Sequence, residues 1–481
     1  MHDIVIIGGG ICGCALAYYL SQYECDVIVI EKENDLAVGT TRANSAILHA
    51  GYDPRPGTIM AATNVTGNKL SFELCRELDV EHNRCGSLVL AFTQAECEQL
   101  QELLARGEAN GVPNQRIISS EEIHKMEPDV SDKVIAGLFA PSAGVVNPWE
   151  MALALAEVAA RNGVHFKFNT KVISIKPLPQ TSGYSIRTEH DDELTSRFVI
   201  NCAGVHAAEI HQLVAKPTFK ITPTKGEYYL LDTHTSVNIN HVLFQCPNEK
   251  GKGVLVSITM HGNTIVGPNA EVVQDPEDTS NTRAGLQFVA TLAKKTVPNL
   301  DLLSNIRNFA GVRANCDRKD FVVEFAAENF LDVAGIQSPG LTSAPALALL
   351  AIDKLKLAGF KSEKKGSWQG GRKVVRFKHL SPEQRAEQIS SDAAYGRVIC
   401  RCETITEGEI RAALKSLIPP VSLDGIKRRC GSGLGRCQGG FCSPKIVEIL
   451  AKHYNCRPEN ICQDKSGTYI LLDERREGRY E

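Results

Sequence analysis

The sequence predicts an α/β protein with a Rossmann-type dinucleotide-binding domain, an interleaved antiparallel-sheet domain and a small, mainly helical C-terminal domain. Three observations predict this architecture. Residues 3–31 read as strand, glycine turn, helix and strand, which is a βαβ unit. Residues 219–268 hold short alternating or apolar runs, which favour antiparallel strands. After residue 395, two pairs of cysteines stand just before two predicted helix starts.

Length and composition limit the class of protein. The 481 residues leave room for two or three domains, and 43% hydrophobic with 23% charged residues is typical of a globular chain. A net charge of −3 favours neither nucleic acid nor an acidic membrane surface as a partner. No apolar run approaches the roughly 20 residues of a membrane helix, and Met1 leads directly into a strand. We therefore expect a cytoplasmic protein that reaches a membrane only through a partner.

The glycine turn predicts a site for a dinucleotide. Gly8 permits the tight turn, Gly10 lets the backbone approach a pyrophosphate, and Gly13 lets the helix pack closely on the strand. The N–H groups at the helix start face the phosphates. Glu31 ends the second strand, where an acid binds a ribose, and Lys32 follows without the arginines that a 2′-phosphate requires. These features favour FAD over NADP; the alternative is a purely structural turn.

A polar segment at residues 39–45 follows, in which Thr41, Asn44 and Ser45 can approach a flavin ring. It leads into a short apolar stretch ending at His49. A neutral imidazole can accept a hydroxyl proton near pH 7, so His49 is a candidate base. The alternative is a structural histidine in the core.

The middle of the chain alternates between the two domains. Helices are predicted at residues 68–79 and 93–110, and at 148–162, where Asn147 is the cap. Strands at 164–168 and 170–175 return the chain to the nucleotide domain and place Val172 near an adenine. The strand that begins at residue 198 ends in Ala203 and Gly204, small residues that suit a backbone passing a dinucleotide.

Later strands form a second sheet and close the nucleotide domain. Runs at residues 227–231, 242–245, 254–259 and 263–267 predict an antiparallel roof over a pocket. The strand at 330–334 leads to a turn of small residues that opens a helix running to about residue 357. The N-terminus of that helix can place positive potential at the electron-accepting end of a flavin. The predicted contacts here are Gly335, Gly340, Leu341 and Thr342.

The paired cysteines predict an iron–sulfur site. Cys400 and Cys402 form C-x-C, and Cys437 and Cys442 form C-x4-C within a glycine-rich stretch. Four such thiolates suit a [2Fe–2S] cluster, because glycine lets backbone N–H groups point at sulfur. A structural zinc site is the alternative, although zinc more often uses C-x2-C. Nearby arginines that could offset the negative charge of the cluster are Arg397, Arg401, Arg428, Arg429 and Arg436.

Three motifs identify a family resemblance in the first three quarters of the chain. They are His49-Ala50-Gly51, Gly311-Val312-Arg313 and the stretch from Ser338 to Thr342, joined to the glycine turn. Together they resemble the D-amino-acid-oxidase-like FAD superfamily, which includes glycine oxidase. Within it they are most similar to the branch of flavin glycerol-3-phosphate dehydrogenases and oxidases and L-2-hydroxyglutarate oxidases.

The resemblance implies oxidation of a secondary alcohol beside an anionic arm. His49 would remove the hydroxyl proton and Arg313 would hold the phosphate or carboxylate. The resemblance also places Lys225 at the substrate or flavin, and Ser338 against the substrate or ring. For Arg313 and Lys225 the alternative is a structural ion pair, and the same question stands for His261.

Residues from about 396 resemble the bacterioferritin-associated-ferredoxin-like [2Fe–2S] domain, and the fusion resembles the large subunits of anaerobic glycerol-3-phosphate dehydrogenases. This implies oxidation of glycerol 3-phosphate, with electrons passing to a quinone or to a partner subunit that carries a second flavin or an iron–sulfur centre. One alternative is a dehydrogenase of L-2-hydroxyglutarate, another 2-hydroxy acid or an amino acid. Another is a non-catalytic electron-transfer subunit.

These inferences divide the chain into four parts. Residues 1–358 form the oxidoreductase; about 1–80, 145–215 and 305–358 would bind FAD, and about 81–144 and 216–304 would bind substrate. Residues 359–395 are a linker, 396–455 the [2Fe–2S] domain and 456–481 a C-terminal tail.

Overall fold

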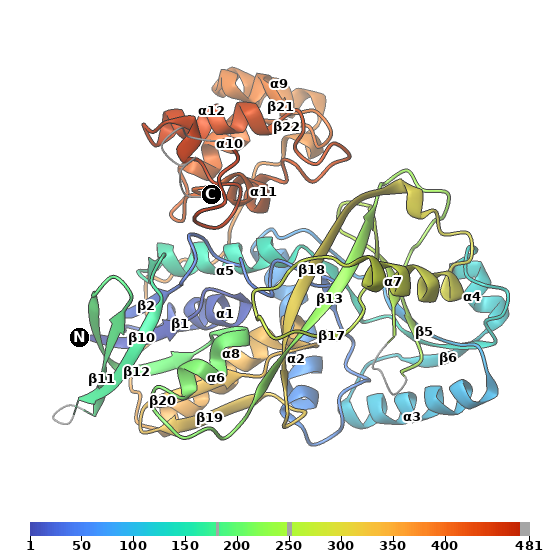
Figure 1. Cartoon of the computed structure of the whole chain (residues 1–481), viewed down its shortest axis with the longest axis horizontal. Helices are drawn as coiled ribbons and strands as arrows, with labels where there is room; N and C mark the ends of the chain where they lie inside the picture. Colours follow the sequence, from blue (N-terminus) through green and yellow to red (C-terminus); the bar gives the residue numbers. More distant parts are fainter. Residues whose placement is uncertain (179–181, 248–252, 472–481) are drawn as a thin grey trace.

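The computed structural model describes residues 1–178, 182–247 and 253–471; part of the predicted tail, residues 472–481, lies outside them. Two large sheets stand side by side, and the C-terminal domain sits above them (Figure 1). The first sheet has the strand order β10-β11-β12-β1-β2-β9, and β20 joins it beside β12 with β19 at its edge. Its strands are β1 (His2–Ile7), β2 (Val27–Ile30), β9 (His165–Lys167), β10 (Val172–Leu178), β11 (Gly183–Thr188), β12 (Glu193–Asn201), β19 (Val322–Ala327) and β20 (Phe330–Ala334).

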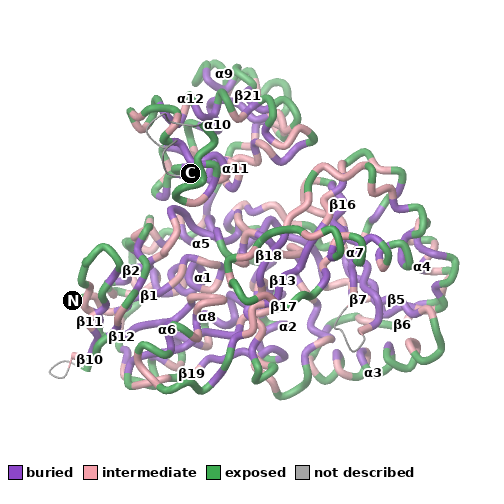
Figure 2. The backbone as a smooth tube through the Cα atoms, viewed as in Figure 1, coloured by how far each residue is buried: buried purple, intermediate pink, exposed green. Residues whose placement is uncertain are grey.

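The central strands of the first sheet are covered on both faces. Strands β1, β2, β9, β12 and β20 pair in parallel, and their apolar residues are buried (Figure 2). Such continuous apolar runs are expected where helices cover a parallel sheet. One face shares the main core with α1 (Ile11–Leu20), α2 (Ile59–Glu77), α5 (Pro148–Arg161) and α8 (Gly340–Leu357).

The second sheet has the order β17-β13-β16-β15-β14-β5-β7-β6, with β18 paired to β13. All its pairs are antiparallel except β14 with β5. The strand β18, which begins at Asn305, pairs with β13 and so lies in the second sheet. The sequence analysis places residues from about 305 in the FAD-binding part. The strands are β5 (Ser87–Ala91), β6 (Arg116–Ser119), β7 (Ala136–Ala140), β13 (Ile221–Leu231), β14 (Val242–Gln245), β15 (Leu255–Ile258), β16 (Thr264–Gly267), β17 (Glu271–Val272) and β18 (Asn305–Cys316).

Helix starts follow the capping residues. Asn147 caps α5, and its side chain accepts the N–H of Glu150 at 3.2 Å, as predicted. By contrast, α2 begins nine residues before its predicted start, because Thr58 caps it by accepting the N–H of Ala61. Two further helices flank the second sheet, α3 (Gln94–Asn110) and α7 (Arg283–Thr296).

The predicted linker is packed against the first domain. Trp368 lies edge-on to Tyr18, and its Nε1–H donates to Ser21. Arg372 pairs with Glu157 at 2.6 Å, and Arg376 forms an ion pair with Asp79. The segment therefore holds the C-terminal domain close to α5 instead of acting as a free tether.

The C-terminal domain is a small helical unit with its own core. Its helices are α9 (Pro382–Ser391), α10 (Glu407–Leu414), α11 (Leu423–Cys430) and α12 (Ser443–His453), beside the short strands β21 (Val398–Cys400) and β22 (Ile405–Thr406). Capping boxes at Ser381 and Thr406 open α9 and α10. Ile410, Ile426, Ile446 and Leu450 meet at the centre. Across the described residues, the helices are too short or too polar to cross a membrane.

Candidate functional site

The glycine turn presents the start of α1 without a side-chain cap from Gly10. Gly8 adopts a φ of +110°, and a Cβ at Gly13 would lie 2.0 Å from the carbonyl oxygen of Gly8. Only glycine tolerates either condition. The hydroxyl of Thr41 accepts the N–H of Ile11 at 3.0 Å, which ties the predicted flavin segment to the helix start.

The side chain of Glu31 lies against this turn. Its carboxylate accepts the N–H groups of Gly9 at 2.6 Å and Glu33 at 2.9 Å. Burial raises the pKa of this carboxyl group. An acid at this place and a glycine turn at the helix start match what the ribose and pyrophosphate of a dinucleotide require. Lys32 instead forms ion pairs with Glu277 at 2.6 Å and Glu33 at 3.1 Å, so its ammonium group is already neutralised.

The other predicted cofactor residues lie at strand ends of the first sheet, in the 39–45 segment and at the start of α8. Val172 packs in one core cluster with Ile30, while Ala203 and Gly204 follow β12 beside Gly8. The amide of Asn44 donates to the carbonyl oxygens of Thr40 and Thr41, so it shapes its own segment. The hydroxyl of Ser45 lies 3.1 Å from that of Tyr228 in the second sheet. Gly335 has a φ of +65° after β20, and Gly340, Leu341 and Thr342 form the first turn of α8.

The structure brings His49 and Ser338 together. Nε2 of His49 lies 3.2 Å from the Ser338 hydroxyl, and the backbone N–H of His49 donates to Thr342 at 2.9 Å. The imidazole stacks on Phe244, with ring centroids 5.8 Å apart. A hydroxyl beside Nε2 and an aromatic face beside the ring fix the orientation of the imidazole.

Arg313 lies on the sheet face that looks toward the flavin segment. On this face, a Cβ at Gly311 would lie 1.9 Å from the carbonyl oxygen of Ala43. Arg313 crosses Gly226 and donates to the carbonyl oxygen of Asn269 at 2.9 Å. Among the described residues, no carboxylate lies within ion-pair distance of its guanidinium group. Among these residues Arg313 therefore forms no structural ion pair, which was the alternative to binding an anionic substrate.

The resemblance placed Lys225 at the substrate or flavin, with a structural ion pair as the alternative, and the structure favours the ion pair. Its neighbour Thr224 pairs with Arg313 across the strands, so Lys225 points to the opposite face of the sheet. There its ammonium group pairs with Asp278 at 2.8 Å. Burial alone would lower the pKa of Lys225, but Asp278 outweighs burial and raises it.

Other residues around His49 were missed by the sequence analysis. Asn64 and Asn68 of α2 both donate to the carbonyl oxygen of His49. Two buried asparagines four residues apart on one helix face are a signal that could have found them. Tyr52 and Phe244 line a pocket with His49, and nothing in their sequence context distinguishes them from core residues.

The four predicted cysteine ligands are gathered in two pairs. The sulfur atoms of Cys402 and Cys437 lie 3.7 Å apart, and Cys400 interacts with Cys442. Tetrahedral thiolates about 2.3 Å from one shared metal ion stand about 3.7 Å apart. The Cys442 thiol, then the backbone N–H groups of Gly433 and Glu403, lower the pKa of Cys400 to about 6.

This arrangement fits a binuclear cluster better than zinc. Backbone N–H groups from the glycine-rich loop point at the sulfur of Cys437 as well. A Cβ at Gly435 would lie 2.4 Å from the Cβ of Cys402, so the loop requires glycine there. Among the described residues, no three His, Cys, Asp or Glu side chains are placed to hold a single metal ion. Two separate pairs are what a [2Fe–2S] cluster needs.

Residues around the cysteines have more varied roles than expected. Arg428 and Arg429 bind Asp35 of the first domain, and Arg436 forms an ion pair with Asp232. These arginines therefore join the domains. Cys430 donates to the carbonyl oxygen of Glu409, and burial raises its pKa to about 12, as suits a thiol outside the ligand set.

Comparisons with known proteins agree with both sites. The model of the FAD dependent oxidoreductase family matches residues 3–354, and that of the BFD-like [2Fe-2S] binding domain matches residues 398–452. The glycerol 3-phosphate dehydrogenase of Caloramator mitchellensis is 44% identical over 474 residues, which is 98% of each chain. The mitochondrial L-2-hydroxyglutarate dehydrogenase of Homo sapiens is 28% identical over 411 residues, covering 74% of this chain and 88% of that one.

A solved structure extends the match to three dimensions. Dithionite-reduced L-alpha-glycerophosphate oxidase from Mycoplasma pneumoniae, with FAD bound, superimposes with a TM-score of 0.73 at 32% identity. The match covers 78% of this chain and 98% of that one. The chain therefore belongs to the FAD-dependent oxidoreductase family, binds FAD, and carries a BFD-like [2Fe–2S] domain between residues 398 and 452.

Proposed function

We propose that this protein oxidises glycerol 3-phosphate to dihydroxyacetone phosphate and delivers the electrons to a partner protein or quinone. The observation that carries the proposal is Arg313. It is half-buried, faces the flavin segment and has no acidic partner among the described residues. A guanidinium group left unneutralised in a protein is suited to a phosphate or carboxylate of the substrate, which it can bind through two parallel hydrogen bonds.

His49 is the proposed base. Its ring is held by Phe244 and Ser338, and its backbone by Thr342 and two asparagines. A fixed imidazole can accept the proton of the substrate hydroxyl while the adjacent carbon loses its hydride. Ser338 positions Nε2 for that transfer. FAD supplies the two-electron acceptor when bound, and the [2Fe–2S] cluster supplies one-electron transfer away from it.

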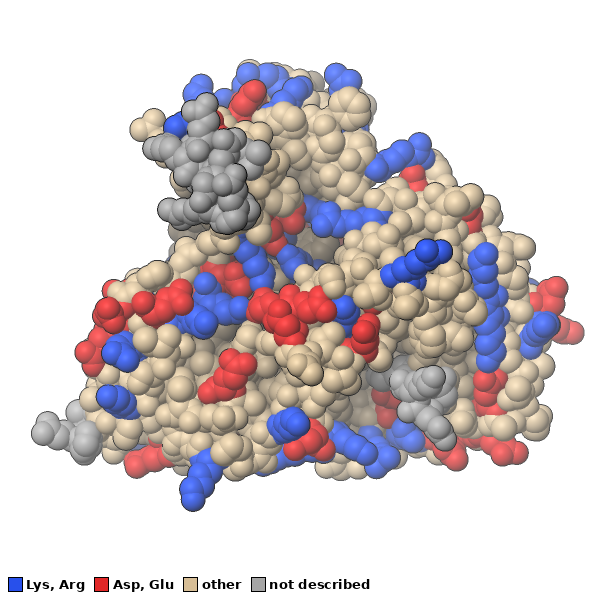
Figure 3. All heavy atoms as spheres, in the orientation of Figure 1, with Lys and Arg blue, Asp and Glu red and all other residues tan. Residues whose placement is uncertain are grey.

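The surface of the C-terminal domain supports a protein as the electron acceptor. Cys402 is exposed, and Phe441, beside Cys442, is 76% exposed. Residues 396–455 contain ten Lys and Arg but five Asp and Glu, and basic side chains lie on the visible face of this domain (Figure 3). An apolar residue beside the cluster ligands and a basic surround favour a partner subunit with an acidic rim, itself carrying a flavin or iron–sulfur centre.

L-2-hydroxyglutarate is the second candidate substrate. The human relative that is 28% identical to this chain is named L-2-hydroxyglutarate dehydrogenase. The carboxylates of L-2-hydroxyglutarate could also bind Arg313. The relative that matches 98% of this chain, including the cluster domain, is a glycerol 3-phosphate dehydrogenase, which favours the phosphate. The two substrates share an anionic arm, so Arg313 alone does not separate them.

The test is an anaerobic titration of the holoenzyme with each compound, followed by the absorbance of oxidised flavin. We expect glycerol 3-phosphate to bleach the flavin and L-2-hydroxyglutarate to leave it oxidised at equal concentration. Bleaching by L-2-hydroxyglutarate alone would reassign the substrate. If neither compound nor an amino acid panel bleaches the flavin, the protein is an electron-transfer subunit.

A further inference from the structure

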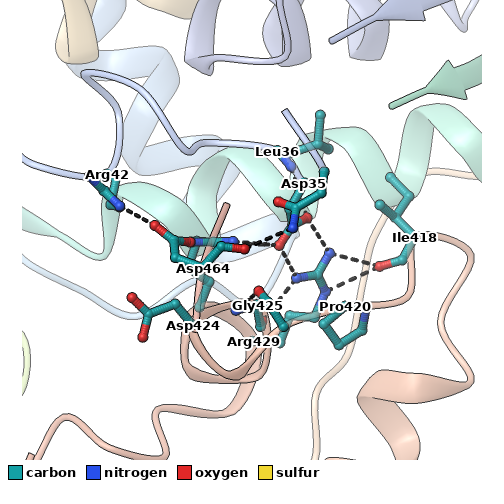
Figure 4. A network of polar contacts seen from close by, with 12 residues as sticks. Asp35, Leu36, Arg42, Ile418, Pro420, Asp424, Gly425, Arg429 and Asp464 are labelled. Carbon is teal, nitrogen blue, oxygen red and sulfur yellow. Dashed lines mark hydrogen bonds and ion pairs between the residues drawn. The ribbon is translucent and has the colours of Figure 1, made fainter. Parts of the chain in front are cut away.

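The C-terminal domain is joined to the first domain by a network of buried charges (Figure 4). The guanidinium group of Arg429 donates to both carboxylate oxygens of Asp35 at 2.8 Å. Arg428 donates to Asp35 at 2.8 Å and to Asp464 at 2.7 Å. Asp464 in turn accepts a hydrogen bond from Arg42. The network thus contains two residues of the segment 35–42 and three from the C-terminal part of the chain.

The centre of this network is closed to solvent. The side chains of Asp35, Arg428 and Arg429 are each no more than 3% exposed. Burial alone would raise the pKa of Asp35, but the two arginines outweigh it and hold that pKa well below its usual range. The Asp35 carboxylate therefore stays charged near neutral pH, and its hydrogen bonds to the two arginines favour one arrangement of the two domains.

The segment 35–42 also builds the FAD cradle. The N–H of Ala37 donates to the carbonyl oxygen of Gly9 at 3.0 Å, within the phosphate turn. Thr41, next to Arg42, accepts the N–H of Ile11 at the start of α1. The C-terminal domain thus binds the same short segment that holds the phosphate turn. It contacts this segment near both ends, at Asp35 and at Arg42.

We propose that Asp35 is a positioning residue for electron transfer between the flavin and the cluster. Through Arg428 and Arg429 it fixes the cluster domain on the flavin-binding segment. Without it the cluster domain samples other orientations, and electrons move from flavin to cluster more slowly, while the chemistry at His49 continues. This inference rests on the proposed passage of electrons from flavin to cluster, but it does not depend on the identity of the substrate.

The test is the variant Asp35→Asn, with Asp424→Asn as the matched control. Asp424 lies beside the network in Figure 4, but its carboxylate binds only exposed Gln463 among described side chains. Flavin is reduced by light in the anaerobic holoenzyme, with EDTA as the sacrificial electron donor, and the cluster is followed by electron paramagnetic resonance. We expect cluster reduction to slow at least tenfold in Asp35→Asn and to stay within twofold of the parent in Asp424→Asn.

A second readout does not require electron flow. Amide hydrogen exchange in residues 423–430 should become at least tenfold faster in the Asp35→Asn protein, whether or not cofactors are loaded. If Asp35→Asn does not fold, Arg429→Lys, which keeps the charge but removes the paired donors, is measured in the same way. Parent-like exchange and cluster reduction in the folded variant would overturn the proposal. Because light reduces the flavin, failure of glycerol 3-phosphate as a substrate is detected separately.

Discussion

At the scale of single residues, His49 owes its role to what holds it. Ser338 contacts Nε2 and Phe244 stacks on the ring. These two contacts fix the orientation of the imidazole in the site. We predict that His49→Gln slows flavin bleaching by glycerol 3-phosphate by about 10² to 10⁴, the usual contribution of a general base. Ser338→Ala should slow it less, because water can replace one hydroxyl.

Anaerobic stopped-flow measurements at the flavin band test this. His165→Gln is the control, since His165 is exposed on β9, far along the chain from the site, and should bleach at the parent rate. Parent-like bleaching in His49→Gln would exclude His49 as the base.

Arg313 and Lys225 form a matched pair of cations on neighbouring strands. Removing Arg313 as Arg313→Met should raise the KM for glycerol 3-phosphate by about 10- to 100-fold, because a hydrogen bond to a charged group contributes about 1.5–3 kcal/mol. Lys225→Met should leave KM within twofold, since Lys225 pairs with Asp278 on the other face. Steady-state kinetics of both variants decide the assignment, and equal KM values for the two would contradict it.

Lys225 shows the limit of sequence motifs at this scale. A motif places a residue on a strand, but alternate residues face opposite sides, and the identity of the inner face depends on pairing. In β13 the pairing of Thr224 with Arg313 decides it. The glycines, Glu31, His49 and the four cysteines could be placed from sequence because turns and spacings are local.

At the scale of elements, the packing of α1 on β1 depends on Gly13. We predict that Gly13→Ala destabilises the protein by about 1–3 kcal/mol, the usual cost of overpacking, and that the purified protein loses most of its FAD. The reason is the 2.0 Å approach of a Cβ to the Gly8 oxygen. Gly366→Ala is the control, because nothing lies within 4 Å of its Cβ and it lies outside the FAD-binding segments. Thermal unfolding and flavin content measure both; normal FAD content in Gly13→Ala would contradict the packing argument.

Elements with local signals were predicted well. The caps at Asn147, Ser381 and Thr406 fix three helix starts, because each side chain satisfies an N–H of its own first turn. The start of α2 at Ile59 was missed, since its first half contains β-branched residues, asparagine and glycine of low helix propensity. Two asparagines of this half, Asn64 and Asn68, donate hydrogen bonds to the backbone carbonyl of His49.

At the scale of the whole molecule, the docking of the domains could not be predicted. Asp35 and Arg428 are separated by 393 residues, and no local pattern links them. The same holds for the linker, in which Arg372 pairs with Glu157 on α5 and Arg376 pairs with Asp79 just after α2. Long-range ion pairs depend on the completed fold, so a sequence shows the partners without the pairing.

The FAD site and the cluster site lie in different domains, so a cluster-ligand variant can separate their roles. Cys437→Ser should remove the cluster, because Cys437 and Cys402 form one of the two thiol pairs. Flavin bleaching by glycerol 3-phosphate should persist within about threefold, since Arg313 and His49 lie in the other domain. Reduction of a one-electron protein acceptor should fall at least tenfold.

Cys456→Ser is the control. Cys456 packs against the apolar core of the C-terminal domain, so this variant should keep its full iron content and full acceptor activity. Iron analysis, paramagnetic resonance and stopped-flow absorbance measure all three effects. A Cys437→Ser protein that reduces the acceptor at the parent rate would show that electrons leave directly from the flavin, and the cluster would then be structural.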